Sequence, residues 1–219
     1  MATAARTAVY LEVGAKRSFA CAIEWPGWSR SDRGQEATLQ ALADYAPRYA
    51  RVAARAGLTI TRITAADLHV VETVAGTATT DFGAPDAIAR ADRRRLDAAS
   101  ARRMVALLDA AWQELDRAVA AAPPGLRKGP RGGGRDHDAV VGHVIDAERA
   151  YARRIGVRLS AAEWRDGHVG LLRARCREVL SRPSDGSAPF ERGWPPRYLA
   201  RRTAWHALDH AWEIDDRAR

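Results

Sequence analysis

The sequence predicts an α+β fold in which a small mixed domain precedes a four-helix bundle. Residues 7–74 contain short runs of alternating apolar residues separated by turn glycines, a pattern typical of β-strands. Beyond residue 95, longer segments carry apolar residues at every third or fourth position, which is typical of bundle helices. With 219 residues and 47% hydrophobic content, the chain can bury a core. We therefore expect a ββ(β)αβ domain over 1–78, a linker over 79–94 and a bundle over 95–219.

The N-terminal domain begins with a predicted β-hairpin. Residues 7–13 and 17–25 alternate as strands do, and the turn between them contains Gly14. Pro26 and Gly27 then reverse the chain, and a short third strand is expected just after them, at Trp28-Ser-Arg30.

A helix and two more strands are predicted to complete this domain. The helix is expected over 34–57, with Gly57 as its C-terminal stop. Residues 58–63 and 68–74 again have the composition of strands.

The first three bundle helices have recognisable starts and stops. The first ends before Pro123, the second begins at the N-cap residue Asp136, and the third begins at a capping box that joins Ser160 to Glu163. Residues 126–135 are rich in glycine, and we expect a loop there that could act as a lid. The inward stripe of the first helix is formed by Met104, Leu108, Ala111, Trp112, Leu115 and Val119.

The last helix carries the most informative pair of residues. Pro195 and Pro196 suit its first turn, and neither Gly nor Pro interrupts it as far as Arg217. His206 and His210 lie four positions apart, so both imidazoles fall on one apolar side, with Cβ atoms about 5–6 Å apart. Both rings can therefore reach one cation.

A different face of this helix carries large apolar side chains that cannot point toward the histidines. We expect this face to pack on the N-terminal domain or on a second subunit, as in a homodimer. Its residues are Trp205, Leu208 and Trp212.

A third metal ligand is expected from another helix. His143, on the flank of the second bundle helix, is the preferred donor, and His168 on the third helix is the alternative. We treat His69 and His137 as incidental. Three imidazoles with one open position are typical of a catalytic metal site, because structural zinc normally has four protein ligands.

A histidine early in the second bundle helix, followed by His-x-x-x-His on the last, resembles the DinB/YfiT-like metalloprotein superfamily. The resemblance covers residues 95–219. It implies that His143, His206 and His210 bind one divalent metal ion, zinc or nickel, with water completing the shell. It also implies a metal-dependent enzyme that uses a small-molecule substrate, by thiol-linked transfer or isomerisation with a low-molecular-weight thiol, or by hydrolysis.

We expect three carboxylates within one helical turn of these histidines, where they could orient them. They are Glu148, Asp209 and Glu213. Glu148 falls on an inward stripe, where an unpaired carboxylate is costly, so it could orient a ligand, bind the metal or act as general base. The alternative is that Glu148 pairs with a nearby arginine.

The N-terminal hairpin, the Trp25-Pro-Gly-Trp28 turn and the acidic helix after it resemble the HicB-like antitoxin domain, over residues 7–75. This resemblance implies an alternative function, in which the chain is a non-catalytic protein that binds a partner through this domain. The bundle histidines would then be structural.

The composition bounds the remaining possibilities. The net charge is +8, but the positive residues are nearly all arginines scattered among acids, as in 90–97, which argues against nucleic-acid binding. Cys21 and Cys176 are isolated, so neither a disulfide framework nor a thiolate zinc site is indicated. The chain has no signal-like segment and no apolar run long enough to cross a bilayer, so we expect a cytoplasmic protein that does not enter membranes.

Overall fold

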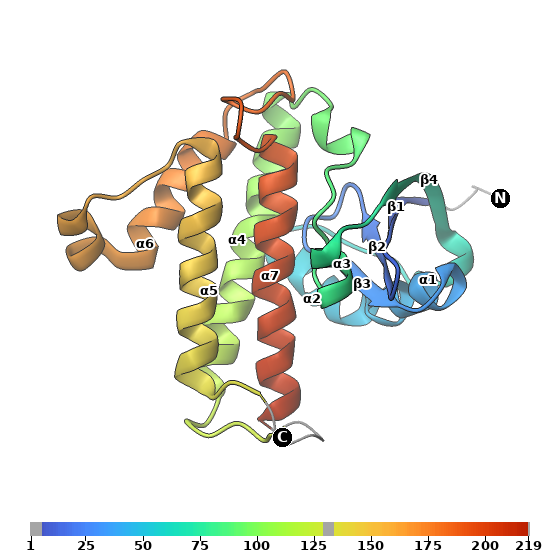
Figure 1. Ribbon diagram of the computed structural model, residues 1–219, viewed down its shortest axis with the longest axis horizontal. Helices are drawn as coiled ribbons and strands as arrows, with labels where there is room; N and C mark the ends of the chain where they lie inside the picture. The colour runs from blue at the N-terminus through green and yellow to red at the C-terminus, as the bar shows by residue number, and fades with distance from the viewer. Residues whose placement is uncertain (1–5, 129–133, 219) are drawn as a thin grey trace.

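The computed structural model describes residues 6–128 and 134–218, and it confirms a mixed α+β fold. A sheet with short helices forms one side of the molecule, and long helices form the other (Figure 1). Part of the predicted glycine-rich lid, residues 129–133, lies outside the described residues.

The sheet has four strands in the order β3-β2-β1-β4. The strands are β1 (Thr7–Val13), β2 (Ser18–Ala22), β3 (Ser29–Asp32) and β4 (Leu68–Ala75). β1 and β2 form the predicted antiparallel hairpin, in which Tyr10 lies opposite Cys21, and β3 extends it on the far side of β2. β4 runs parallel to β1, so the chain crosses over between them. The hairpin, the short third strand and the strand at 68–74 are confirmed.

The single helix predicted over 34–57 is wrong, because two helices occupy this stretch. They are α1 (Gln35–Asp44) and α2 (Ala46–Arg55). The break at Tyr45 follows from Pro47, which lacks an N–H and whose ring would collide with the carbonyl group four residues earlier in a continuous helix. Proline is instead accommodated in the first turn of α2. Gly57 ends this region with φ of 71°, as expected.

The strand predicted at 58–63 is also wrong. This segment has no ladder partner, and only the short helix η1 (Ala65–Asp67) separates it from β4. Ile60 and Ile63 pack against the core as partly buried side chains. Their alternation therefore reflects contact with the core rather than pairing in the sheet.

The segment predicted as a linker is folded. It contains α3 (Ala78–Phe82) and η2 (Arg90–Arg93). Buried Glu12 of β1 accepts hydrogen bonds from the backbone N–H groups of Asp86 and Ala87, at 2.8 and 3.0 Å. These bonds fasten the segment to the sheet.

Four long helices make up the C-terminal half. They are α4 (Ala98–Ala121), α5 (His137–Ala152), α6 (Ala161–Leu180) and α7 (Pro196–Arg217), with η3 (Arg153–Ile155) after α5. α4, α5 and α7 lie side by side, whereas α6 leans away from them on the side opposite the sheet (Figure 1). The predicted capping box of Ser160 and Glu163 begins α6. Asp136 stands at the N-cap of α5, but its carboxylate accepts from Lys128 rather than from the helix backbone.

α7 joins the two halves of the molecule. The edge of the Trp205 ring meets Phe19 of β2 at 6.0 Å between centroids, and Trp212 packs against Tyr45 at 5.3 Å. Leu208, between them, is fully buried. Of the two predicted contacts of this face, the structure shows the one with the N-terminal half. A second subunit is therefore not needed to cover it.

Gly27 allows this close approach. A Cβ atom at this position would lie 2.8 Å from the Leu208 side chain, and the backbone φ of 91° also favours glycine. One hydrophobic core runs from the sheet through α2 and α7 into α4 and α5.

Candidate metal centre

Three histidines converge where α5 meets α7. The ligating atoms of His143, His206 and His210 all lie within 4.8 Å of one another, and their ring centroids are 4.6–5.0 Å apart. The four-residue spacing puts two of the rings on one side of α7. α5 runs antiparallel to α7 (Figure 1), and its His143 ring lies 5.0 Å from each of them.

The closest approach in this cluster has the dimensions of a metal site. Nε2 of His143 and Nε2 of His206 are 3.2 Å apart. Two nitrogens bound to one tetrahedral zinc at about 2.0–2.1 Å would be about 3.3 Å apart. The same separation also suits an N–H···N hydrogen bond between two neutral rings.

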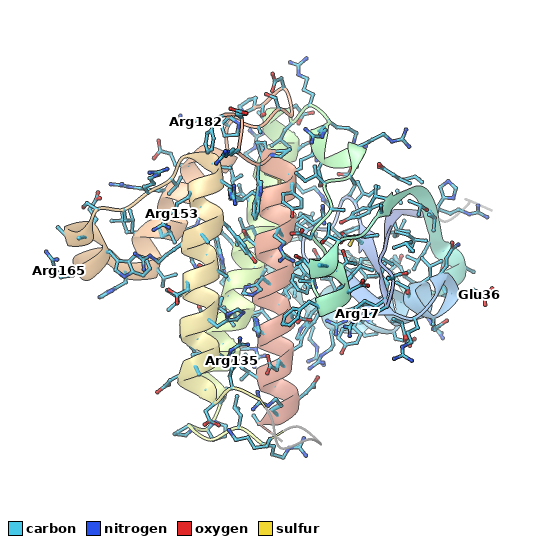
Figure 2. The ribbon with its side chains drawn as sticks, in the orientation of Figure 1. Arg17, Glu36, Arg135, Arg153, Arg165 and Arg182 are labelled. Atoms are coloured by element: carbon cyan, nitrogen blue, oxygen red, sulfur yellow. The ribbon has the colours of Figure 1, made fainter. Side chains whose placement is uncertain are left out.

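Burial favours the neutral form of His143 and His206, which is the form that a metal requires. Desolvation, followed by the nearby His210 and His143, lowers the pKa of His206 to about 2. Burial also lowers the pKa of His143, and the charge of Arg135 adds to this effect. Figure 2 shows Arg135 beside the lower halves of α5 and α7. Neutral imidazoles are the form that binds metals.

Glu213 orients the third ring. Its Oε2 accepts a hydrogen bond from Nδ1 of His210 at 2.8 Å, and its Oε1 accepts from Arg217 at 2.6 Å. The hydrogen bond from His210 is the largest cause of the lowered pKa of Glu213, so this carboxylate is ionised. In a neutral imidazole, a proton held at Nδ1 by this carboxylate leaves the lone pair of Nε2 for a metal.

Glu148 does not support the histidines, which corrects the expectation from sequence. Its carboxylate is 4% exposed and accepts two hydrogen bonds of 2.8 Å from Arg173 of α6. Burial raises the pKa of Glu148, and the Arg173 guanidinium opposes this shift. Five positions along a helix correspond to roughly 140° of rotation, so Glu148 and His143 point to different sides of α5.

Asp209 also points away from the cluster. It forms an ion pair of 3.0 Å with Arg30 of β3, whose guanidinium stacks on Tyr45. Asp209 therefore belongs to the contact between α7 and the N-terminal half.

The remaining histidines lie apart from the cluster. His168, the alternative third ligand, is exposed and has a non-helical φ of 47° inside α6. His69 is exposed on β4. His137 connects α5 to α4 through Val119, whose carbonyl oxygen lies 3.0 Å from its Nε2.

Two residues beside the site had not been predicted. The Tyr151 ring lies 5.8 Å from His206, and the Arg202 guanidinium lies 5.6 Å from the Tyr151 ring. Tyr151 is eight positions after His143 on α5, and Arg202 is four positions before His206 on α7. The helical period alone could therefore have placed them on the same sides as the ligands.

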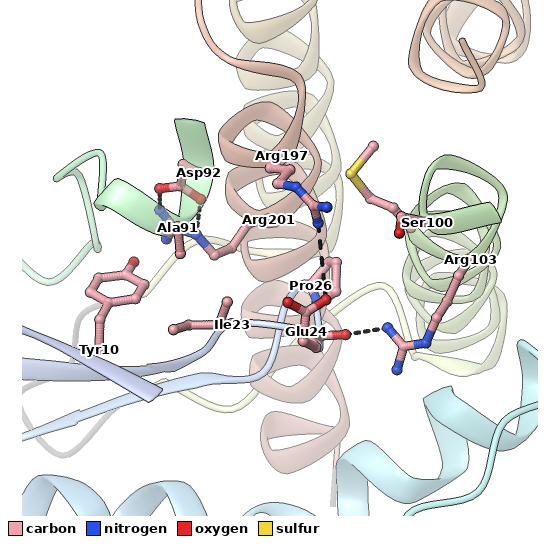
Figure 3. A pocket seen from close by; sticks show the side chains of 11 residues that line it. Tyr10, Ile23, Glu24, Pro26, Ala91, Asp92, Ser100, Arg103, Arg197 and Arg201 are labelled. Atoms are coloured by element: carbon pink, nitrogen blue, oxygen red, sulfur yellow. Dashed lines mark hydrogen bonds and ion pairs between the residues drawn. The ribbon is translucent and has the colours of Figure 1, made fainter. Parts of the chain in front are cut away.

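A separate cavity of about 40 Å³ lies between the sheet and the helices α4 and α7 (Figure 3). Its arginines already have partners within the protein. Arg201 pairs with Asp92, and Arg103 donates to the backbone carbonyl oxygen of Glu24. This volume suits water molecules and is far below the several hundred Å³ of an organic-ligand pocket. The cavity is therefore part of the joint between the two halves.

Comparisons of the chain with protein-family models, with curated proteins and with solved structures find no match. Among the helices that the structure describes, none combines the length and the apolar character needed to cross a bilayer.

Proposed function

We propose that this protein binds one divalent transition metal ion, zinc or nickel, through His143, His206 and His210. The observation that carries the proposal is the convergence of three imidazoles on one point between α5 and α7. Zinc and nickel both accept imidazole nitrogen, and among the described residues the cluster contains neither a thiolate nor a fourth protein ligand. A DinB-like bundle is the architecture we propose for the C-terminal half.

We further propose that the site is catalytic. A metal held by three protein ligands keeps a position open, at which it can polarise a carbonyl group or supply hydroxide near neutral pH. The chain contributes two features to such chemistry: Glu213 fixes the tautomer of His210, and burial keeps His206 neutral. Thiol-linked transfer or isomerisation, or hydrolysis, are the reaction classes we propose.

Elemental analysis of protein purified without a histidine tag tests metal binding. We expect about one equivalent of metal per chain in the wild type and little in the double variant His206→Ala, His210→Ala. His69→Ala, which changes an exposed histidine, is the matched control and should retain its metal. Full occupancy in the double variant would overturn the assignment.

Activity assays on metal-loaded protein, with and without a low-molecular-weight thiol, test catalysis separately. Turnover that disappears on chelation and returns with added metal supports an enzyme. If the metal-loaded protein shows no turnover of thiol or ester substrates, the proposal of catalysis is overturned and only metal binding remains.

A further inference from the structure

Arg202 is a buried cation that lacks a carboxylate partner among the described residues. Its side chain lies on α7 and is 6% exposed. Nη1 donates to the carbonyl oxygen of Pro85 at 2.8 Å, whereas Nε is buried without a hydrogen-bond partner. The guanidinium otherwise faces aromatic rings, at 5.6 Å from Tyr151 and 5.0 Å from Trp205.

The other buried arginines among the described residues each have a carboxylate partner, although Nη1 of Arg201 is, like Nε of Arg202, buried without a hydrogen-bond partner. Arg201, the neighbour of Arg202 on α7, forms two hydrogen bonds with Asp92, and Arg173 forms two with Glu148. A buried charge without a counter-ion is costly, because desolvation is then not offset by an ion pair. Arg202 thus has the environment of a group that binds an anion from outside the chain.

Arg202 also lies beside the metal centre. It is one helical turn before His206, and its charge contributes to the lowered pKa of that histidine. Tyr151 contacts both residues from α5, and half-buried Ala147 lies one turn from Tyr151 and one turn from His143. His143, Ala147 and Tyr151 thus follow one another along α5, and the small side chain of Ala147 stands in the middle. This part of α5 faces the part of α7 that runs from Arg202 to the histidines.

Asp86 is the acid closest to this region along the folded segment before η2. Its carboxylate accepts a hydrogen bond from the Thr77 hydroxyl at 3.3 Å. Burial raises the pKa of Tyr151, the Arg202 guanidinium opposes this shift, and the charge of Asp86 adds to it least. No ion pair joins Asp86 to Arg202 in the part of the chain described here, so the charge of Arg202 remains available.

We propose that Arg202 binds the carboxylate of a small molecule whose other end reaches the metal centre, about one helical turn or 5–6 Å away. The proposal rests on the proposed function and names the substrate class of that site. A planar guanidinium matches a carboxylate with two parallel donors, and a single arginine balances a single negative charge. Tyr151 and Trp194, whose rings lie 5.2 Å apart, provide an aromatic wall beside this position.

Cobalt-loaded protein allows a direct test, because thiolate binding changes the visible absorption of Co²⁺. The probes are 3-mercaptopropionate and its neutral isostere 3-mercapto-1-propanol. We expect the wild type to bind the carboxylate probe at least about 10-fold more tightly than the alcohol. Arg202→Met should bring this ratio close to one with an unchanged cobalt content, and Arg202→Lys should keep part of it. Arg153→Met, at an exposed position of η3, is the control that should keep the full ratio.

The outcomes separate the inference from the proposed function. A normal cobalt content with an unchanged probe ratio in Arg202→Met overturns the role of Arg202 and leaves the metal site standing. If the wild type binds no cobalt, the proposed function fails. Arg202 is then tested in metal-free protein with propionate, which should raise the melting temperature of the wild type, raise that of Arg202→Lys by less, and leave that of Arg202→Met unchanged. Equal shifts in the wild type and Arg202→Met would overturn the inference.

Discussion

One of two glutamates near the histidines contacts the cluster and the other does not, and the helical period explains both positions. Glu213 is three positions after His210, so it lies on the same side of α7 and reaches that ring. Glu148 is five positions after His143, so it lies on another side of α5 and pairs with Arg173. The burial of Glu148 could be predicted from its stripe, and the alternative that it pairs with an arginine is confirmed. Which arginine it pairs with could not be predicted, because Arg173 comes from a different helix.

At the residue scale we predict that Glu213→Gln weakens metal affinity. The amide can still contact His210, but it loses the negative charge that favours the Nδ1–H tautomer and strengthens Nε2 as a ligand. Loss of such a partner typically costs about 10- to 100-fold in affinity. A competitive zinc titration measures the change. Asp209→Asn is the matched control, because this neighbouring acid faces Arg30; an equal loss in both variants would point to net charge instead.

We predict the opposite pattern for Glu148→Gln. Removing one partner of a buried ion pair leaves the other uncompensated, at a cost of about 3 kcal/mol in the free energy of unfolding. Arg173 keeps only the exposed Asp116 as an ionic partner in this variant. Urea denaturation should show this loss, and the metal affinity should stay at the wild-type value. Glu178→Gln, on α6, removes an exposed pair with Arg182, which lies just beyond the end of this helix, and should cost less than about 1 kcal/mol.

Helices that begin at a capping residue or a proline could be predicted from the sequence, but the pairing of one element with another could not. Capping and proline signals predict the starts of α6 and α7, whereas the helix break before Pro47 was not predicted. The segment 58–63 has strand composition, but the edge it would need is occupied by β4, which crosses over to pair with β1. Which strands are neighbours depends on long-range contacts, and local pattern does not encode them.

At the element scale we predict that α7 depends on its N-terminal contact as well as on the bundle. Leu208→Ala removes a fully buried side chain between α7 and Gly27, and such truncations cost about 2–5 kcal/mol. The melting temperature measures the effect. Phe82→Ala, at an almost fully exposed position on α3, should change stability by less than about 0.5 kcal/mol. Similar behaviour of the two variants would mean that the two halves do not share a core.

On the scale of the whole molecule, the sheet and the bundle lie on one continuous core, and α7 is buried from both sides. Sequence patterns identified the two apolar faces of α7 separately. They could not show that the histidine face would meet α5 rather than α6, because both helices present apolar stripes. His168 therefore stayed an alternative to the preferred His143, and the exposure of His168 argues against it.

This burial makes the stability of the metal-free protein depend on pH. His206 has a pKa of about 2 in the folded chain against about 6.5 when unfolded. As the pH falls below about 6.5, the unfolded chain binds a proton that the folded chain does not, so stability decreases by up to about 1.4 kcal/mol per pH unit. The lowered pKa of His143 acts in the same direction.

We predict that urea denaturation in the presence of a chelator shows a smaller loss in the free energy of unfolding between pH 7 and pH 5 for His206→Gln than for the wild type. His69→Gln should follow the wild type, since that ring is exposed on β4. Identical pH dependence in the wild type and His206→Gln would mean that His206 is solvated, and an accessible, protonated ring at this position would not be a ready metal ligand.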